Sequence, residues 1–450
     1  MPLCSTRSLS CPLSWLSPVC SSAKRRARHR RRHERGGLGP ATDPASPPPA
    51  GWTSEATRRP TPHSERQNRD EGRRSSVDRP TNGEQAIPTK ENIMSDQCPL
   101  VLLGTSTRDN DSKGVYAARQ DTETGQLEIV GHGPQLNSPT FIAVHPSKKV
   151  IYAIDSLGGG KEASTLTALT LESDTGEMAV INTASTKGPG TCHVSVDREA
   201  TMVVTASFAG GCASAHLIRE DGGVSAATWF EKYEGSSCHP RQTVSHAHSV
   251  WIDPTDQYAL VCDLGTDLVN IYKLDKENGT LVSSRSPYAR IKGGCGARHL
   301  CFHPNGKWAY VISELNSAIT FFDWDAGTGA LTEVEHIATL PEDYDGPNNT
   351  AADIHCTPDG SLLYGTNRGQ DMIIMCRVDQ ETGKLTFLGY ERCGDHPRNF
   401  GIDPEGKFLY CCHLGSNDVF CYRINYDTGL LERIEENTLA LPAPVCIKWV

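Results

Sequence analysis

The amino-acid sequence predicts an all-β fold, a seven-bladed β-propeller made of four-stranded antiparallel blades. Three observations support this prediction. The first is a short strand phrase that recurs at a spacing of about fifty residues, a period typical of propellers and solenoids. Its seven copies are PTFIAVHP from Pro139, GTCHVSVD from Gly190, AHSVWIDP from Ala247, ARHLCFHP from Ala297, AADIHCTP from Ala351, PRNFGIDP from Pro397 and APVCIKWV from Ala443.

The second observation is that two further strand phrases repeat in step with the first. The second strand of a unit reads like VIYAIDS from Val150 or FLYCCHLG from Phe408, and the third like LVNIYKLD from Leu268. A turn of the form D-x-x-T/N-G-x-L follows, as in DAGTGAL from Asp325. Glycine supplies the positive φ that this turn needs. Each unit therefore holds about four short antiparallel strands, the content of one propeller blade.

The third observation is the phase of the repeat at the two ends of the chain. VLLGTST from Val101 matches the second strand type and GVYAARQD from Gly114 the third, whereas the closing APVCIKWV matches the first. We therefore expect N- and C-terminal strands to share one blade and to close the ring without an open edge. A right-handed β-helix is the structural alternative, but solenoid coils are shorter and usually lack these hairpin turns.

The chain is expected to contain one folded domain, residues 98–450, preceded by an extension, residues 1–93. The extension is rich in Arg, Pro and Ser and has few apolar residues to offset the entropy of ordering, so we expect disorder. It carries 17 Lys and Arg against 9 Asp and Glu, which leaves 27 against 45 in the rest, a net charge of −18. An acidic domain binds nucleic acid poorly, so the propeller is not expected to have a nucleic-acid partner.

Three interpretations of the extension stay open. Residues 1–33 precede the first acidic residue, Glu34, and resemble an organellar transit peptide. The basic run KRRARHRRRH from Lys24 also fits a nuclear signal, and translation could instead start at Met94. We expect a cytoplasmic protein, with organellar targeting as the alternative. No apolar run of about 18 residues is present, so a membrane span is not expected.

The 17 cysteines predict neither a disulfide framework nor a metal centre. Many lie in strand patterns, and no CxxC or Cys/His pair has zinc-site spacing. We expect most of them to be small, reduced core residues, as suits an intracellular protein. Cys411 and Cys412 are adjacent in one strand and should point to opposite faces.

Polar residues gather at one predicted end of the ring. In an antiparallel hairpin, the start of one strand lies beside the end of the next. Residues at the start of each first strand (the entrances) and at the end of each second strand (the exits) therefore lie at one end of the ring, its mouth. Propellers commonly bind ligands there. The entrances supply His248, Arg298, His299, Asp353, Arg398 and Asn399, and the exits supply Asp155, Asp263, Glu314, Asn316, Asn367, Arg368 and His413. Arginines beside His and Glu could hold an anion and activate a water.

Structural roles are the alternative for many of these polar residues. Residues in the turns at the far end of the first strands, which we expect to be structural, are His145, Asp253, His303 and Asp403. Asp155 and Asp263 could cap turns or, together with Asp353, bind calcium at the central channel. Arg298 and Glu314 could form a plain structural ion pair.

Four long stretches carry a resemblance to a known family. They are RQTVSHAHSVWIDP from Arg241, GCGARHLCFHPNGKWAYVISELNSAITFFDWDAGTGALTEV from Gly294, NNTAADIHCTPDGSLLYGTNRG from Asn348 and HPRNFGIDPEGKFLY from His396. They resemble the bacterial-type 6-phosphogluconolactonase family, whose members are seven-bladed propeller lactonases. The family also includes fungal carboxymuconate lactonizing enzymes, so the fold alone leaves the substrate open.

The resemblance implies catalytic roles for a His, an Arg, a Glu and a second Arg. The matching positions are His248, Arg298, Glu314 and Arg368, with Arg398 as the substitute for the last. The residues predicted to bind substrate are His299, Asn316, Asp353, Asn367 and Arg398. In this scheme His248 or Glu314 is the general base and Arg298 the oxyanion partner. Arg368 and Arg398 hold a phosphate, and no metal or cofactor is required.

The implied function is hydrolysis of 6-phospho-D-glucono-1,5-lactone in the oxidative pentose phosphate pathway. One alternative is action on another carboxylated lactone, including the cyclisation of a muconate, and another is a scaffold without enzymatic activity. Arg binds carboxylate and phosphate with similar geometry, so the anion preference stays open. The expected partner is a small phosphorylated sugar lactone, and a closed propeller is expected to be a monomer.

Overall fold

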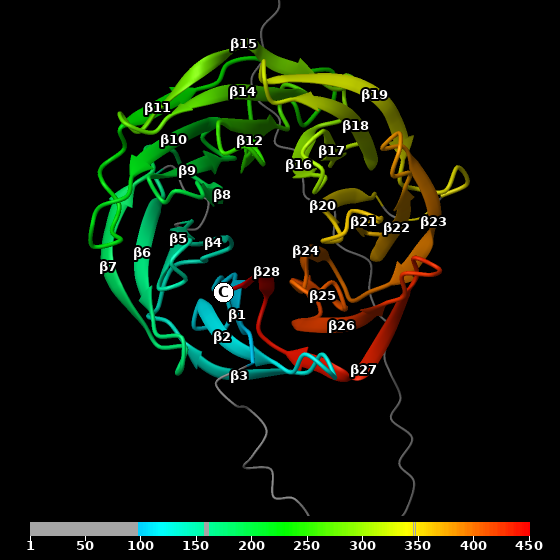
Figure 1. Ribbon diagram of the computed structural model, residues 1–450, viewed down its shortest axis with the longest axis horizontal. Coiled ribbons are helices and arrows are strands. Elements are labelled where there is room, and N and C mark those ends of the chain that lie inside the picture. The colour runs from blue at the N-terminus through cyan, green and yellow to red at the C-terminus, as the bar shows by residue number, and fades with distance from the viewer. Residues whose placement is uncertain (1–97, 157–161, 345, 347) are drawn as a thin grey trace, which may run out of the picture. The chain divides into compact units, whose positions relative to one another are not determined.

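A computed structural model of the protein describes residues 98–156, 162–344, 346 and 348–450. The extension predicted for residues 1–93 lies outside the described residues. The described part forms seven four-stranded antiparallel sheets arranged in a ring, which confirms the predicted seven-bladed propeller (Figure 1). Its residues contain no helix long and apolar enough to cross a membrane.

The chain runs through most blades from the innermost strand to the outermost. Blade 1 contains β28 (Pro444–Trp449), β1 (Leu100–Thr105), β2 (Val115–Gln120) and β3 (Leu127–His132). Blade 2 contains β4 (Ile142–Val144), β5 (Val150–Asp155), β6 (Thr165–Leu171) and β7 (Met178–Ser185). Blade 3 contains β8 (Thr191–Val196), β9 (Met202–Ser207), β10 (Cys212–Leu217) and β11 (Trp229–Lys232).

The second half of the ring repeats this order. Blade 4 contains β12 (Ala247–Ile252), β13 (Tyr258–Asp263), β14 (Leu268–Asp275) and β15 (Thr280–Arg290). Blade 5 contains β16 (Ala297–Phe302), β17 (Trp308–Ser313), β18 (Ala318–Asp325) and β19 (Ala330–Ala338). Blade 6 contains β20 (Thr350–Cys356), β21 (Leu362–Arg368), β22 (Met372–Val378) and β23 (Leu385–Arg392). Blade 7 contains β24 (Pro397–Ile402), β25 (Phe408–His413), β26 (Asp418–Ile424) and β27 (Leu431–Ala440).

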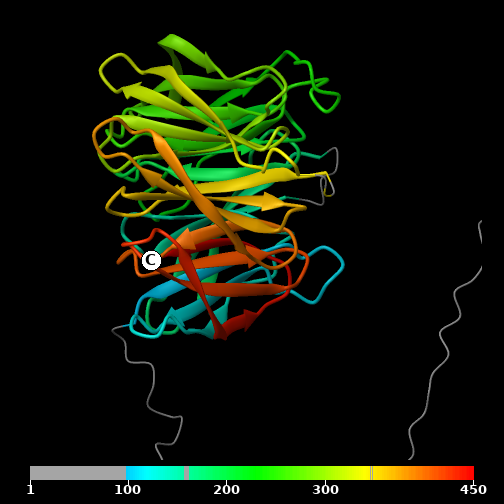
Figure 2. The same ribbon diagram turned by 90° about the vertical axis from the view of Figure 1, so that its right-hand side faces the viewer.

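The ring closes through blade 1, as the phase of the repeat predicts. The last strand, β28, pairs antiparallel with β1, with Val101 opposite Trp449 and Gly104 opposite Cys446. Neighbouring innermost strands contact one another all the way round, from β4 through β24 to β28 and back to β4. Figure 2 shows the ring from its side, where the later blades, coloured yellow to red, follow one another. Closure therefore completes blade 1 with the last strand of the chain and ties the two ends of the propeller together in one sheet.

The blades are joined by hydrophobic packing between their faces. Successive residues of a strand point to opposite faces, so one strand serves two interblade cores. Cys411 of β25 packs with Tyr364 and Phe400, whereas Cys412 packs with Val101 and Ile447 on the other side. This confirms that the two adjacent cysteines point in opposite directions. Every cysteine of the described residues is a free thiol.

A repeated tyrosine joins the second strand of a blade to the outer turn of the next blade. The hydroxyl of Tyr310 on β17 donates to the carbonyl oxygen of Gly383 at 2.7 Å. The same bond recurs from Tyr152 to Gly222, from Tyr364 to Gly429 and from Tyr410 to Gly125. Gly383 has a φ of +74°, and a Cβ there would lie 2.5 Å from Cζ of Phe321. The turn therefore needs glycine both for its backbone conformation and for its close approach to the neighbouring blade.

We predict that Tyr310→Phe lowers the free energy of unfolding by about 1–2 kcal/mol, because the substitution removes one buried hydrogen bond between blades 5 and 6. Urea denaturation measures this change. Tyr288→Phe is the matched control, since Tyr288 is about half exposed, and it should leave the stability unchanged. Equal stability of the Tyr310 variant and the wild-type protein would contradict the proposed role of the tyrosine.

Candidate functional site

The predicted mouth is the end of the ring at which the innermost strand of a blade begins and its second strand ends, as the pairing of these strands shows. Ala297 at the start of β16 lies opposite Ser313 at the end of β17, and Pro397 of β24 lies opposite His413 of β25. Blades 4 and 6 show the same pairing at the starts of β12 and β20. Strand entrances and exits therefore meet at one end of the ring, which we call the mouth.

A β-bulge interrupts the innermost strand close to this mouth in six of the seven blades. The register shifts lie between Thr191 and His193, Ala247 and Ser249, Ala297 and His299, Ala351 and Ile354, Pro397 and Asn399, and Pro444 and Cys446. A bulge leaves its extra residue outside the ladder and redirects the side chain. The residues at the shifts are Cys192, His248, Arg298, Ala352 with Asp353, Arg398, and Val445. The bulges therefore set three of the predicted site residues at equivalent places in blades 4, 5 and 7.

Glu314, which follows β17, holds three guanidinium groups. Its Oε2 accepts from Nε of Arg298 at 3.0 Å and from Nη2 of Arg368 at 2.9 Å. Its Oε1 accepts from Nη2 of Arg241 at 2.7 Å. Glu314, Arg298 and Arg368 are buried, whereas the side chain of Arg241 is 47% exposed. Charge-assisted bonds of this kind fix both partners, so the carboxylate organises the three arginines.

The charges of this group follow from burial and mutual contact. Burial alone raises the pKa of Glu314, but the guanidinium groups of Arg368, Arg298 and Arg241 outweigh it and hold the pKa well below its usual range. Burial, followed by the nearby charges of Arg368 and Arg398, lowers the pKa of Arg298 to about 9. The carboxylate is therefore ionised and the arginine still protonated at neutral pH.

The arginines keep unused hydrogen-bond donors. Arg298 donates from Nε to Glu314 and from Nη1 to the carbonyl oxygen of Ala352 at 2.5 Å, which leaves Nη2 without a partner among the described residues. Arg398 is partly buried and forms no hydrogen bond or ion pair within the described ranges. It is nevertheless close enough to lower the pKa values of Arg298 and Arg368. Three guanidinium groups therefore bind one carboxylate, and a fourth, that of Arg398, lies near two of them.

His248 lies beside this group with a neutral ring. Burial, and then the charges of Arg298, His299 and Arg398, hold its pKa well below the ordinary value of 6.5. Its ring is 5% exposed, and its buried Nδ1 has no hydrogen-bond partner within the described residues. The ring packs edge-on against Phe208, with 5.6 Å between the centroids. An uncharged imidazole next to several arginines can accept a proton when an anion enters.

Asp353 is the centre of a separate buried network. Its Oδ1 accepts from Nδ1 of His299 at 2.7 Å, and its Oδ2 accepts from Nε2 of His355 at 3.0 Å and from the amide of Asn399. Burial lowers the pKa of His299 to about 3, with Arg298 as the second cause. The ring centroid of His299 lies 5.2 Å from that of His248, so the network of Asp353 packs directly against His248.

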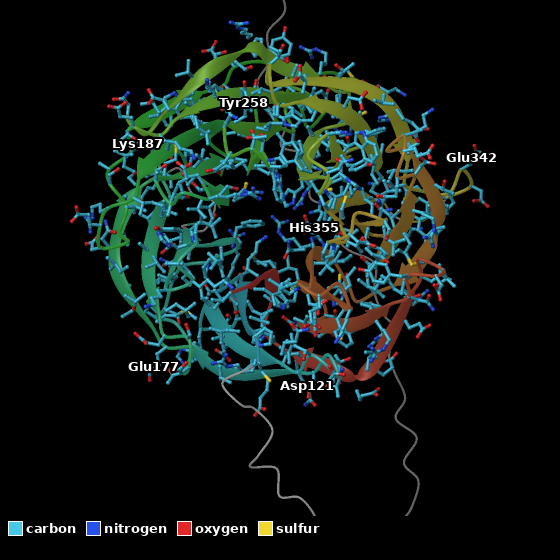
Figure 3. All side chains as sticks on the ribbon, in the orientation of Figure 1. Asp121, Glu177, Lys187, Tyr258, Glu342 and His355 are labelled. Atoms are coloured by element: carbon cyan, nitrogen blue, oxygen red, sulfur yellow. The ribbon has the colours of Figure 1, made fainter. Side chains whose placement is uncertain are left out.

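Aromatic rings pack around this network near the centre of the propeller. His193 lies 3.9 Å from Phe141 and 4.8 Å from Trp251, measured between ring centroids. Figure 3 labels His355, which projects from β20 close to the centre of the ring. These rings therefore pack against the histidines of the Asp353 network.

Two predicted substrate-binding residues, Asn316 and Asn367, do not contact the arginines that surround Glu314, which we call the arginine group. Asn316 is exposed, and its amide lies 3.4 Å from Nε2 of His336 on the outer strand β19. Asn367 is buried, and its amide donates to the carbonyl oxygen of Thr339 at 3.0 Å and to Gln370. Asn316 lies in the turn after β17, and Asn367 points to the face of β21 opposite to that of its neighbour Arg368, so both amides bond to residues on or just after β19. Their predicted binding roles gain no support from these contacts.

The structural alternatives are confirmed for several turn residues. The carboxylate of Asp263 accepts from Ser245 and from the backbone N–H groups of His246 and Gly265, so it caps the local turns. His303, by contrast, accepts from Asn305 N–H in its own turn and lies 2.9 Å from the carbonyl of Gly360. Asp253 and Asp403 likewise accept from backbone N–H groups at the start of the next strand. The predicted calcium alternative gains no support, since Asp263 and Asp353 have separate partners.

Sequence reasoning missed three residues near the site. Arg241 lies in the connection before β12, 73 positions before its partner Glu314, and the one signal for it was that it begins the first stretch that resembles the family. Burial and the charges of Arg368 and Arg398 lower the pKa of His396 to about 4. His193 occupies the position of His299 in its own strand, and its place in the repeat could have identified it.

The fold and the site together define a propeller enzyme with a cationic site, because a scaffold needs no buried guanidinium group around one carboxylate. Residues 100–449 match the family model described as lactonase, 7-bladed beta-propeller. The chain belongs to this lactonase family.

Relatives support the same assignment. The chain is 31% identical over 351 residues to the 6-phosphogluconolactonase of Bacillus subtilis, a match that covers 77% of this chain and 97% of the relative. It is 30% identical to the 6-phosphogluconolactonase of Serratia proteamaculans, over 69% of this chain and 88% of the relative. A solved protein of Bacteroides fragilis is 29% identical, with a TM-score of 0.73 over 81% of this chain and all of the other. A periplasmic gluconolactonase of Pseudomonas aeruginosa, 23% identical over 78% of this chain and 99% of the other, shares the fold with a TM-score of 0.73.

We predict that the stability of the propeller falls as the pH falls below 6.5. Burial holds the pKa values of His193, His248 and His299 below that of the unfolded chain. The unfolded state therefore binds these protons first, so stability is complete above pH 6.5 and is lost as the pH falls. Each ring should remove about 1 kcal/mol between pH 6.5 and 5.5.

Urea denaturation at the two pH values measures the loss. His248→Asn should decrease the loss by about 1 kcal/mol, whereas His132→Asn, at an exposed ring, should leave it as in the wild-type protein. The same pH dependence in the wild-type protein and the His248 variant would contradict a buried neutral imidazole at this position.

Proposed function

We propose that the protein hydrolyses 6-phospho-D-glucono-1,5-lactone to 6-phosphogluconate, the reaction of the oxidative pentose phosphate pathway. The observation that carries the proposal is the group of Arg241, Arg298 and Arg368 held by Glu314 beside the neutral ring of His248. The printed names of relatives from Bacillus subtilis and Serratia proteamaculans support this substrate.

The excess of positive charge supports an anionic substrate. Arg241, Arg298 and Arg368 share the carboxylate of Glu314, and Arg398 adds a fourth positive charge close to Arg298 and Arg368, in a propeller whose overall charge is strongly negative. A phosphate can accept several N–H donors at once from planar guanidinium groups. Arg398 is the best placed for this role, since it has no hydrogen-bond or ion-pair partner among the described residues.

The contacts favour His248 over Glu314 as the general base. Both oxygens of Glu314 are engaged by arginines, which also hold its pKa low, so the carboxylate is a weak base. His248 is neutral and keeps a nitrogen without a hydrogen-bond partner within the described residues. An entering phosphate would offset the arginine charges that lower the pKa of His248, and the ring would then be a better base.

The reaction follows from these roles. Water attacks C1 of the lactone while His248 takes a proton from it, and the carbonyl oxygen becomes an oxyanion that Arg298 stabilises through Nη2. The bond between C1 and the ring oxygen then breaks, and His248 returns the proton to the ring oxygen, which becomes the 5-hydroxyl group. The new acid loses a proton to solvent. Glu314 acts by positioning the arginines.

The proposal is tested by the hydrolysis of freshly generated 6-phosphogluconolactone, with the spontaneous rate subtracted. Unphosphorylated gluconolactone is assayed in parallel. Strong acceleration of the phosphorylated lactone supports the proposal. A rate equal to the spontaneous one would contradict it.

The free thiols support a reducing compartment, as the cysteine pattern predicts, and we infer a monomer in the cytoplasm. Sγ atoms of Cys301 and Cys356 lie 3.8 Å apart without a disulfide. Sedimentation analysis tests the monomer, and fractionation of cells that make the protein tests the location.

We predict that Arg298→Ala lowers kcat by about two to three orders of magnitude, because a preorganised oxyanion donor is lost. Circular dichroism and the thermal midpoint check that the variant folds. Arg219→Ala is the control, since Arg219 forms an exposed pair with Asp221 in blade 3, and it should keep full activity. Equal turnover of the Arg298 variant and the wild-type protein would remove Arg298 from the mechanism.

We predict that Arg398→Gln raises KM for the phosphorylated lactone by about 10- to 100-fold, since one charge-assisted contact to the phosphate is lost. The KM for gluconolactone should change little. Steady-state kinetics with both lactones measures the difference. Equal increases in KM for the two substrates would show that Arg398 does not bind the phosphate.

A further inference from the structure

Two cysteines and a histidine come together between blades 6 and 7, and none of them has a role in the proposed reaction. Cys393 directly follows β23 of blade 6, whereas Cys411 and His413 lie on β25 of blade 7. The two Sγ atoms and a ring nitrogen lie within 4.8 Å of one another. Side chains that are 18 and 20 positions apart in the sequence thus converge from two blades.

His413 is held in the orientation that a metal ligand requires. Its ring is fully buried, and Nδ1 lies 2.8 Å from Oδ1 of Asp418. The carboxylate accepts the Nδ1 proton, so the lone pair of the neutral ring is on Nε2. That atom is buried, and its neighbour among the described residues is the thiol of Cys393, with which it forms no hydrogen bond of ordinary geometry. A histidine whose second nitrogen donates to a carboxylate is the usual outer-shell arrangement of a metal-binding histidine.

The surroundings of the ring leave no room for it to turn away. A Cβ on Gly394 would lie 2.7 Å from Cγ and 2.8 Å from Nδ1 of His413, so only glycine fits beside the ring. Cys411 and His413 are buried, while Cys393 is partly exposed and gives an ion access from the connection. The three side chains are therefore held in place before an ion binds, and the site is accessible from the side of Cys393.

We propose that Cys393, Cys411 and His413 bind one Zn²⁺ ion, with the fourth position left to water. Two thiolates and a neutral imidazole suit a borderline-soft ion that prefers tetrahedral nitrogen and sulfur ligands. Binding releases two thiol protons, and the two thiolates balance the charge of the ion, which lowers the cost of its burial.

The ion would fasten the connection between blades 6 and 7. Residues 393–396 lead from β23 to β24, and the backbone N–H of Cys393 donates to the carbonyl oxygen of Asp371. An ion bound only by the folded chain raises its stability. Zn²⁺ binding should therefore raise the thermal midpoint.

A second group of ligand-type residues does not support the same inference. Asp197, Glu199 and Asp256 also lie close together, but Nζ of Lys276 forms ion pairs with all three, at 3.4, 3.1 and 2.5 Å. The ammonium group already occupies the centre of these carboxylates. Among the described residues, the cysteine and histidine group is the one whose centre holds no cation.

Titration of the full chain with Co²⁺, in reductant and after removal of metals, tests the zinc site. Thiolate-bound tetrahedral Co²⁺ gives a charge-transfer band in the near ultraviolet and intense visible bands. We expect a saturable signal, displaced by Zn²⁺, that Cys393→Ser and His413→Gln each decrease by one ion per chain. Cys238→Ser, at an exposed thiol, is the control and should leave it unchanged. The difference between variants separates this site from thiols elsewhere in the chain.

Two results would overturn the zinc site. One is a Co²⁺ signal of the same size in the wild-type protein and Cys393→Ser, which keeps the shape of the partly exposed side chain. The other is a Cys393–Cys411 disulfide, found by peptide mass mapping, that persists in reductant. A Zn²⁺-dependent rise in the thermal midpoint of the wild-type protein that is absent from Cys393→Ser would support the proposal without a spectroscopic signal.

Discussion

The site depends on one constraint, that six of the seven blades are crossed by the chain from the inside outward. Each innermost strand must then begin at the same end of the ring, beside the end of the strand that follows it. The closing pair of β28 and β1 keeps this order in blade 1 as well. Residues from positions far apart in the sequence, such as His248, Arg298 and Arg398, therefore meet without any long functional loop. The bulge near the start of each of these strands adds the redirection that the ladder alone cannot give.

Electrostatics explains why one carboxylate is enough to build the site. Arg298 and Arg368 are buried, and burying charges costs free energy unless they are paired. Glu314 provides that pairing and also binds Arg241 at the rim, yet donors on the arginines stay unused. Burial, followed by the same positive charge, holds the pKa of His248 low and keeps its ring neutral. The site therefore suits an anionic substrate, because the negative charge of the substrate offsets the positive charge of the arginines that Glu314 does not neutralise.

The repeated phrases predicted the seven inner strands, the closure of the ring and the end at which polar residues gather, since each depends on local pattern and strand direction. The meeting of Arg298 with Glu314 was predictable for the same reason. The bulges were not, because an extra residue is defined only by the register with the neighbouring strand. Arg241 was missed because it lies in the connection before β12, and the repeat does not determine the length or path of that connection. Its contact with Glu314 therefore could not be predicted from the repeat. Asn316 and Asn367 were predicted at the correct end, but Asn316 lies in the turn after β17 and Asn367 points to the opposite face of β21 from Arg368, so both bond away from the arginines.

The central claim is that the arginine group at the mouth binds the anionic lactone. A crystal structure of the protein with the product, 6-phosphogluconate, tests it most directly. The account predicts that the phosphate contacts Arg398, and that the C1 carboxylate lies against Arg298 within reach of His248. Product bound at another place on the propeller, with the mouth filled only by solvent, would contradict the account.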